Sequence, residues 1–442
     1  MIKTAVIFDN LGPYHKARLR RANGVCNLLA IELGSVSAEY AWSNQVIAGF
    51  RHTVVNTDGS SHALPIADYR MRLHAILGDF RPDVVAVPGW ASTGAFLAFE
   101  WCVRNRCPAI IMSESTAWDE PRMVWKEWIK GQVVGLASSA LVGGSPHAEY
   151  MHQLGMLEDR TFLGYDAVDN DYFAKEVVKW RTKGGNFDHS YLPYFLASNR
   201  FIAKKNLSRL LEAYAIYSMV GQGSGAQRKD GENEGQPPPW PLCLLGDGEL
   251  KSFLISQCYR LGLEVTESAP WESSLTSDYS PTQYSSTPLG TRGPLRRSSP
   301  TVFFPGFRQI DELPRFYAHA GAFVHASTTE PWGLVVNEAM AAGLPVIVSD
   351  RVGCARDLVK HGVNGFAFDP LDVNALAGHL RRVADVQFPH EAFSQASVAS
   401  VGEWGCDRFA AGLKHAVEAA VRHGPRGATF VQRLLLSLLL CR

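Results

Sequence analysis

The sequence lacks a Cys-x-x-Cys pair, an excess of either charge and a long uninterrupted hydrophobic segment. Its eight cysteines are scattered, which argues against a zinc or dithiol redox site and predicts reduced, mostly buried thiols. Lys and Arg together number 43, and so do Asp and Glu. Because the chain has no net charge, no bulk field attracts nucleic acid or an anionic membrane, and nucleic acid is excluded as a partner. Any anionic ligand must be held by a local cluster of cations.

The hydrophobic segments at the two ends are short. In "MIKTAVIFDN" the apolar run covers only residues 5–8, too few for a signal peptide or a membrane span, and this predicts a cytoplasmic protein. The ending "ATFVQRLLLSLLLCR" is more apolar, but Gln432 and Arg433 interrupt it. We expect a packed terminal helix there rather than an anchor, with at most peripheral membrane association.

Length and composition fit a globular protein of two domains. The chain has 442 residues, of which 46% are hydrophobic and 19% charged. Short apolar runs such as "TAVIFDN", "DVVAVPG", "PAIIMSES" and "SALVGGS" alternate with helix-like segments in the first half. Runs of this kind are typical of strands buried on both faces, so the alternation predicts a parallel, doubly wound α/β sheet.

A second series of strand-like runs follows, comprising "YFLASN", "PLCLLG", "VFFPG", "GAFVHAS" and "PVIVSD". We therefore predict two Rossmann-like domains in tandem, over residues 1–180 and 181–405, followed by C-terminal helices over 406–442 that pack back towards the first domain. Residues 221–239 and 272–300 are rich in Gly, Ser, Thr and Pro, and we interpret them as disordered surface insertions.

The segment "ASTTEPWGLVVNEAMAAGLPVIVSD" places two glutamates, Glu330 and Glu338, around a turn and a predicted helix. Ligands of open α/β sheets bind beyond the carboxyl ends of the strands, where Glu330 would stand. Gly333 permits close approach of backbone, and the free N–H groups of the helix start suit a phosphate. Ionised carboxylates accept hydrogen bonds from paired hydroxyls, so this combination indicates a nucleotide sugar. The alternative is that both glutamates are ordinary turn and solvated helix residues.

This segment resembles the Glu-x7-Glu motif of the group 1, or family 4, retaining glycosyltransferases, because turn, helix, Gly343-x-Pro345 and strand follow in the family's order. In "ASNRFIAKKNLSRL", Arg200 and Lys205 occupy the positions of the family's arginine and lysine for the donor pyrophosphate. Two fixed cations after a strand would also neutralise a diphosphate leaving group on physical grounds alone.

The resemblance implies a full set of site residues. Glu330, Arg200 and Lys205 would be catalytic, with Glu330 on the sugar hydroxyls and Glu338 on the ribose. The donor-binding residues would be Gly12, Gly306, Phe307, Trp332, Gly333, Leu334, Val335 and Glu338. No metal site is expected, because Asp169-x-Asp171 lies in a linker where the family has a similar stretch without a metal role.

The first half departs from the family pattern. Gly12, in "DNLGPYHKARLRRA", matches one position of the family's glycine-rich loop, and His15 is a candidate for contact with the acceptor. Glu114 stands where the family often has a histidine near the transferred sugar. Together with Asp119 and Arg122 it could line an acceptor pocket, so the family's acceptors cannot be carried over to this chain.

The resemblance implies a GT-B architecture, with two Rossmann-like domains facing a cleft. The function it implies is the transfer of a hexose from a nucleotide-diphosphate sugar, with retention of the anomeric configuration and without a metal ion. The acceptor is unidentified and would be a carbohydrate, a lipid-linked molecule or a small molecule. No cofactor is expected beyond this co-substrate. The alternatives are a degenerate sugar-binding or scaffold protein of the same fold and a nucleotide-sugar epimerase. The sequence identifies neither the sugar, the base nor the acceptor.

Overall fold

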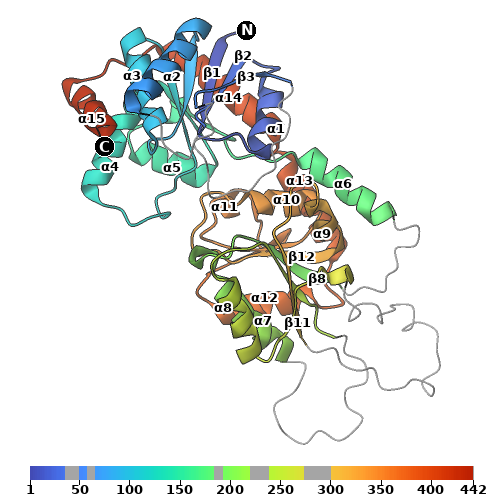
Figure 1. Cartoon of the computed structure of the whole chain (residues 1–442). Helices are drawn as coiled ribbons and strands as arrows, with labels where there is room; N and C mark the ends of the chain where they lie inside the picture. Colours follow the sequence, from blue (N-terminus) through green and yellow to red (C-terminus); the bar gives the residue numbers. More distant parts are fainter. Residues whose placement is uncertain (35–48, 57–64, 184–192, 220–237, 273–299, 442) are drawn as a thin grey trace, which may run out of the picture. The chain divides into compact units, whose positions relative to one another are not determined.

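The computed structural model describes residues 1–34, 49–56, 65–183, 193–219, 238–272 and 300–441 (Figure 1). Both predicted insertions, 221–239 and 272–300, fall almost entirely outside these residues. The chain divides into two compact units, the first formed by 1–169 with 403–442 and the second by 170–402. The sequence placed the boundaries after residues 180 and 405. Residues 170–180 group with the second unit because their helix packs on two helices of that unit.

The first unit is built on a seven-stranded sheet in the order β3-β2-β1-β4-β5-β6-β7. Its strands are β1 (Lys3–Phe8), β2 (Asn27–Glu32), β3 (Arg51–Val54), β4 (Val84–Pro88), β5 (Ala109–Ser113), β6 (Ser139–Val142) and β7 (Thr161–Leu163). Every neighbouring pair is parallel. Successive residues of β1 face opposite sides, since Ala5 and Ile7 join one apolar cluster and Val6 and Phe8 the other. The predicted parallel α/β sheet is confirmed.

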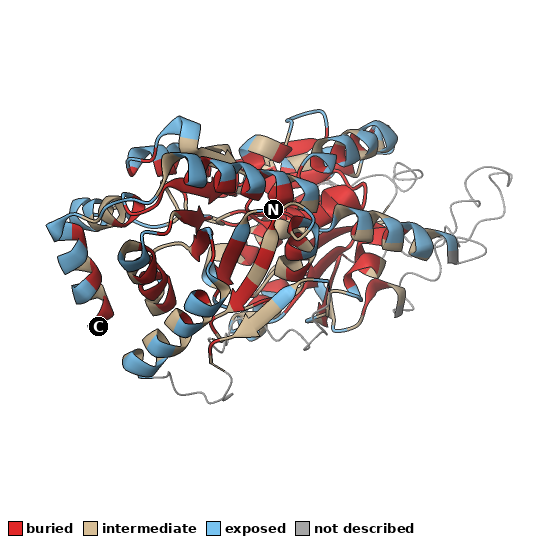
Figure 2. Cartoon of the chain, turned by 90° about the horizontal axis from the view of Figure 1, so that it is seen from above, coloured by how far each residue is buried: buried red, intermediate tan, exposed pale blue. Residues whose placement is uncertain are grey.

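Helices cover both faces of this sheet: α1 (Pro13–Ala22), α2 (Ile66–Phe80), α3 (Thr93–Asn105), α4 (Val124–Val134), α5 (Ser145–Gln153), α14 (Cys406–His423) and α15 (Phe430–Leu440). Figure 2 shows the buried strands and the exposed outer faces of the helices. The long apolar stripe of α14 packs beside α1 on one face, while α15 packs against α3 and α4 on the other. Both C-terminal helices thus belong to the first unit.

The second unit contains a parallel seven-stranded sheet in the order β10-β11-β9-β8-β12-β13-β14. The strands are β8 (Tyr194–Ser198), β9 (Leu242–Leu245), β10 (Glu264–Thr266), β11 (Thr301–Gly306), β12 (Ala320–His325), β13 (Val346–Ser349) and β14 (Gly365–Phe368). The helices are α6 (Asn170–Lys183), α7 (Leu207–Met219), α8 (Lys251–Arg260), α9 (Leu313–His319), α10 (Leu334–Ala341), α11 (Ala355–Leu358), α12 (Val373–Val383) and α13 (His390–Gly402).

Two further sequence expectations concern the whole chain. All eight cysteines are free, and six of them are buried, as predicted; Cys406 is partly exposed and Cys441 exposed. No helix among the described residues combines the length and the hydropathy that a membrane span requires.

Candidate functional site

The second sheet reverses its strand order between β8 and β12. From β8 the chain moves outward to β9 on one side, and from β12 it moves outward to β13 on the other. Loops that leave the carboxyl ends of such adjacent strands diverge and form the binding position of open α/β sheets. The loop after β8 carries Arg200 and Lys205, and the loop after β12 carries Glu330. The three residues predicted to be catalytic therefore come from the two loops at this switch point.

The turn that carries Lys205 is bound directly to the loop after β12. Residues 203–205 form a single 3-10 turn that ends at Asn206, whose backbone is left-handed with φ 57°. The side-chain amide of Asn206 donates to the carbonyls of Ala326, at 3.0 Å, and Pro370, at 2.8 Å. The N–H of Thr328 donates to the carbonyl of Lys204 at 2.9 Å. These bonds hold the ammonium of Lys205 beside the carboxylate of Glu330.

Lys205 and Glu330 form an ion pair in which both side chains are largely buried, at 11% and 14% exposure. Burial opposes ionisation of Glu330, but contacts with His325 and the charge of Lys205 outweigh it and hold the pKa of Glu330 well below its usual range. Burial lowers the pKa of Lys205; the Glu330 charge opposes this shift, while the charges of Lys204 and Arg200 add to it. Arg200 lies on the same loop as Lys205.

His325 was missed by the sequence analysis, although it ends the strand that leads to Glu330. Its side chain is fully buried, and Nε2 lies 3.6 Å from Oε2 of Glu330 and 3.2 Å from Oγ of Ser327. Burial lowers the pKa of His325, which keeps the ring neutral at pH 7. A histidine at the end of a buried strand carries no sequence signal that separates this position from an ordinary core site.

Four of the fourteen buried side-chain polar atoms that lack a hydrogen-bond partner among the described residues lie on or beside the same two loops. They are both amide atoms of Asn199, Oγ1 of Thr329 and Nδ1 of His325. Asn199 follows β8 directly, and Thr329 precedes Glu330. Buried polar groups are normally paired, and an unpaired group in a native structure calls for a ligand, water or functional explanation.

The glycines of "LLGDGEL" fix the loop of Arg200. Gly246 and Gly248 both have positive φ, and a Cβ on either would meet backbone atoms of Asn199 or Phe201 within 2.8 Å. Phe201 N–H donates to the carbonyl of Asp247 at 2.8 Å. The loop after β9 can therefore lie flat against the loop after β8 only because these positions lack side chains.

The turn between β12 and α10 contains two of the predicted donor residues, Trp332 and Gly333. Gly333 has φ 97° and begins α10, and a Cβ there would lie 2.8 Å from Val352. Trp332 is buried, and its indole N–H donates to Oδ1 of Asn337 at 2.9 Å, so its side chain anchors the turn inside the unit. Leu334 and Val335, the first residues of the helix, are half-buried.

Glu338 lies on the inner side of α10. It is fully buried, and its Oε2 accepts a hydrogen bond from the hydroxyl of Tyr317 at 2.8 Å. Tyr317 in turn packs edge-on against Phe173 of α6, with 5.9 Å between the ring centroids. The structure thus distinguishes the two glutamates, because Glu330 lies at the switch point with some exposure while Glu338 is covered.

Gly306 and Phe307 follow β11. Gly306 has φ 85° and its carbonyl accepts the N–H of Gly246 at 3.1 Å, which ties this loop to the loops after β8 and β9. Nothing would lie within 4 Å of a Cβ at Gly306, and the side chain of Phe307 is exposed. Both positions leave backbone accessible at the same edge of the sheet.

In the first unit, Gly12 and His15 shape a helix start. Gly12 is the N-cap of α1, and its N–H donates to Nδ1 of His15 at 3.2 Å. Burial, with a smaller contribution from Arg18, lowers the pKa of His15 to about 3. The ring therefore accepts a backbone hydrogen bond at the start of α1 and stays neutral at pH 7.

The other acceptor candidates lie in the segment after β5. Glu114 is exposed directly beyond the strand. Asp119 and Arg122 form an ion pair, Asp119 accepts the N–H of Thr116 at 3.0 Å, and Arg122 donates to the carbonyl of Ala117 at 3.0 Å. These contacts close the loop upon itself. Among the described residues no three or more His, Cys, Asp or Glu side chains are grouped to hold a metal ion.

Residues 296–397 match the family described as glycosyl transferases, group 1. The matched segment contains Glu330, Trp332, Gly333 and Glu338.

Relatives by sequence match only in part. The uncharacterized glycosyltransferase MJ1607 of Methanocaldococcus jannaschii is 30% identical over 142 residues, which cover 32% of this chain and 27% of that protein. Sulfoquinovosyl transferase SQD2 of Arabidopsis thaliana is 43% identical over 81 residues, 18% of this chain and 16% of that protein. The matches thus span well under half the length of these relatives.

The likeness in fold covers nearly the whole chain. Anabaena Alr3699/HepE, solved in complex with UDP and glucose, aligns with a TM-score of 0.59 and 17% identity over 92% of this chain and 96% of that one. At this identity the comparison establishes the fold alone. The two parallel sheets match the GT-B architecture that the sequence predicted.

Proposed function

We propose that this chain transfers a sugar from a nucleoside-diphosphate sugar to an acceptor, with the donor bound at the switch point of the second unit. The observation that carries the proposal is the convergence of Arg200, Lys205 and Glu330 on the loops after β8 and β12. Two cations and one carboxylate at the end of a parallel sheet fit a diphosphate beside a hydroxylated ring.

In this proposal the cations stabilise the leaving diphosphate. Charge develops on its oxygen as the bond to the anomeric carbon breaks, and fixed positive groups stabilise such a charge most effectively in a partly dry site. In the structure the ammonium of Lys205 neutralises Glu330. A bound diphosphate would share that ammonium, which leaves the carboxylate of Glu330 available to accept sugar hydroxyls.

Glu330 is a positioning group for the sugar rather than a nucleophile in this scheme. Its carboxylate is held between Lys205 and His325, and its lowered pKa keeps it ionised, so that it can accept O–H hydrogen bonds. The orphaned amide of Asn199 and hydroxyl of Thr329 lie on the same loops and offer further contacts to the donor. Glu338 contacts the ribose only if its carboxylate becomes accessible when the donor binds, because it is buried against Tyr317.

We further propose that transfer retains the anomeric configuration and needs no metal ion, since Arg200 and Lys205 supply the positive charge at the diphosphate. Anabaena Alr3699/HepE was solved with UDP and glucose, so UDP-glucose is the first donor to test. The acceptor is a carbohydrate, a lipid-linked sugar or a small molecule.

Donor hydrolysis and transfer by the purified protein test the proposal. A panel of nucleotide sugars is first screened by thermal shift, because a ligand at a hundred times its Kd adds about 2.7 kcal/mol of stability. A stabilising donor should then be hydrolysed, and Arg200→Ala and Lys205→Met should lower kcat while Lys204→Met should not. A donor that binds without hydrolysis or transfer would identify a sugar-binding protein, and a changed sugar released as nucleotide sugar would identify an epimerase.

A further inference from the structure

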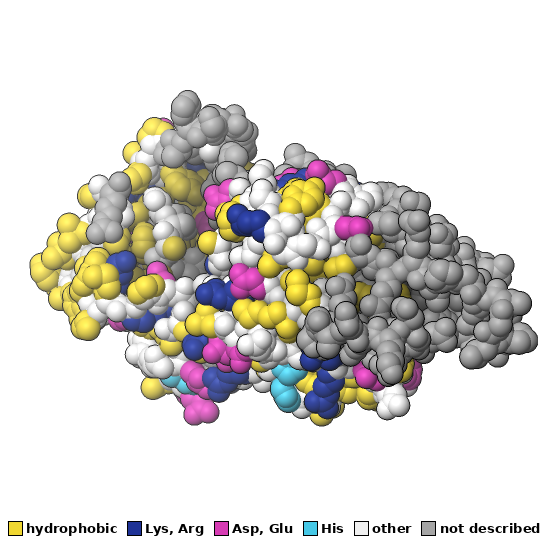
Figure 3. All heavy atoms as spheres, turned by 90° about the horizontal axis from the view of Figure 1, so that it is seen from below, with side chains coloured by type: hydrophobic (Ala, Val, Ile, Leu, Met, Phe, Trp, Pro, Cys, Tyr) yellow, Lys and Arg dark blue, Asp and Glu magenta, His cyan; other side chains and the backbone are white. Residues whose placement is uncertain are grey.

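Two neighbouring helices of the first unit expose an unusual amount of apolar surface. Eight of the 21 exposed large hydrophobic residues lie on α15, on α4 or immediately before α4. They are Met123, Val124, Trp125, Trp128, Phe430, Val431, Leu434 and Leu438, which together we call the α4–α15 face. Hydrophobic side chains gather at the left of Figure 3, the side on which Figure 1 places both helices. Contiguous apolar patches of this kind mark interaction sites.

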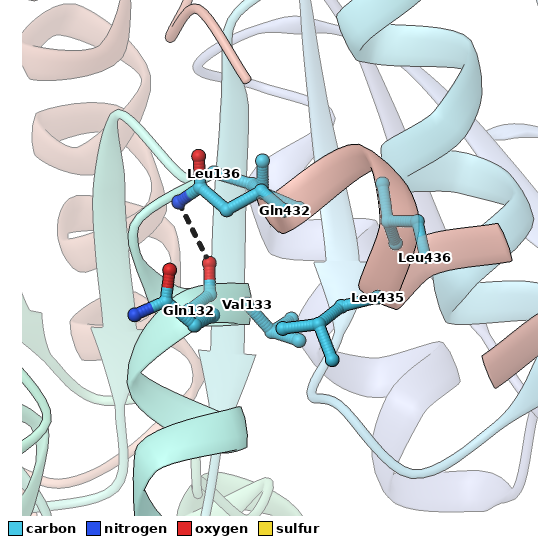
Figure 4. Close-up of a pocket in the computed structure, with 6 residues that line it drawn as sticks. All are labelled: Gln132, Val133, Leu136, Gln432, Leu435 and Leu436. Atoms are coloured by element: carbon cyan, nitrogen blue, oxygen red, sulfur yellow. Dashed lines mark hydrogen bonds between the residues drawn. The ribbon is translucent and has the colours of Figure 1, made fainter. Parts of the chain in front are cut away.

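The two helices are held together from the inside. The side-chain amide of Gln432 donates to the carbonyl of Gln132 at 3.0 Å, and apolar side chains of both helices line the pocket between them (Figure 4). Leu436 and Leu440 are buried in the core of the first unit, and Thr429 caps α15 through the N–H of Gln432. The helix α15 is therefore a docked element with one buried and one exposed side, and not a loose tail.

The charges on this face are mainly positive. Arg433 lies on α15, and Arg426 lies four residues before its first residue, Phe430. Arg426 and Arg433 are exposed, as is Lys126 on α4. The nearest acidic residues of α4 and the loop before it, Glu127 and Glu120, are paired with Lys130. In a protein without net charge, this local excess of cations complements an anionic surface.

We propose that the α4–α15 face docks onto the headgroup region of a membrane that contains anionic lipids. The helix α15 has 11 residues and a length of about 16 Å, so it would lie in the plane of a membrane whose hydrocarbon core is about 30 Å thick. Exposed tryptophan with lysine and arginine is typical of interfacial segments. This proposal does not rest on the proposed function.

Vesicle flotation with the full-length protein tests it. We expect binding to vesicles of phosphatidylcholine with phosphatidylglycerol and much weaker binding to phosphatidylcholine alone. One basic residue near an anionic surface contributes about 1 kcal/mol, so Lys126→Glu with Arg433→Glu should lower binding by about thirtyfold or more. Leu434→Glu should lower binding at least tenfold, since a buried leucine contributes about 1.5–3 kcal/mol. Phe253→Glu, at a comparably exposed position of α8, should bind as the wild type.

Wild-type protein provides a second readout that needs no variant. Brominated lipids should quench tryptophan fluorescence in anionic vesicles, and Trp125→Phe with Trp128→Phe should remove most of that quenching. Absence of vesicle binding by folded wild-type protein would overturn the proposal. So would equal binding by Leu434→Glu, or a lipid-free dimer that Leu434→Glu dissociates, because the face would then belong to a second copy of the chain.

Discussion

Replacing Lys205 by methionine should destabilise the second unit measurably, because it leaves the carboxylate of Glu330 at 14% exposure without its cation. Breaking a buried ion pair from one side costs about 3–5 kcal/mol, and the remaining exposure favours the lower value. For a unit of roughly 230 residues, 1 kcal/mol shifts Tm by about 2–4 °C, so Lys205→Met should lower Tm by about 6–12 °C.

A double-mutant cycle separates the interaction energy of the Lys205–Glu330 ion pair from other destabilising effects of the two substitutions. Glu330→Gln alone should cost less than Lys205→Met, because burial already lowers the pKa of Lys205 and a lysine without a partner can lose its proton. The double variant should be more stable than the sum of the single changes implies, by about 1–3 kcal/mol. Differential scanning calorimetry of the four proteins gives these values, with Lys204→Met as the matched control. Additive losses, or an unchanged Tm in Lys205→Met, would refute the reasoning.

Three further outcomes follow from the structure. Glu330→Gln should lower kcat more than donor affinity, whereas Glu338→Ala should raise the KM for the donor by about ten- to a hundredfold, and Tyr317→Phe should reproduce part of that KM effect in steady-state kinetics. Asn206→Ala should lower Tm, because it leaves two buried carbonyl groups without their hydrogen-bond donor, at a cost of about 1–3 kcal/mol in the free energy of unfolding. The same change should lower kcat, because the turn that holds Lys205 is no longer fixed. Because the pKa of His15 is about 3 when folded and about 6.5 when unfolded, urea denaturation should show stability rising with pH across this window, and His15→Gln should flatten that rise.

Most of the central strands could be predicted from the sequence because their apolar runs are long enough to be recognised. The same logic located Arg200, Lys205 and Glu330 at strand ends, and parallel strands bring such ends together. The strands β2, β3, β7, β10 and β14 were not predicted. The edge strands β3, β7 and β10 are only partly buried and lack continuous apolar runs, whereas β2 and β14 are more buried and were missed all the same.

Side-chain surroundings within the site could not be predicted. The sequence gives no indication that Asn206 adopts a left-handed conformation and ties two loops together. Nor does it show that Trp332 turns inward to Asn337, or that Glu338 is covered and bound by Tyr317. These features depend on packing between segments far apart in the chain, and spacing alone contains no information about them.

Isothermal titration of a nucleoside diphosphate tests most directly whether the donor binds at the switch point between β8 and β12. UDP, GDP and ADP are titrated into the wild type in the presence of a chelator, and the one that binds is then titrated into Lys205→Met and Lys204→Met. We expect Lys205→Met to weaken binding by about ten- to a hundredfold, because hydrogen bonds to charged groups contribute about 1.5–3 kcal/mol, and Lys204→Met to stay within twofold of the wild type. Binding by none of the three diphosphates, or equal binding by Lys205→Met and the wild type, would contradict the account.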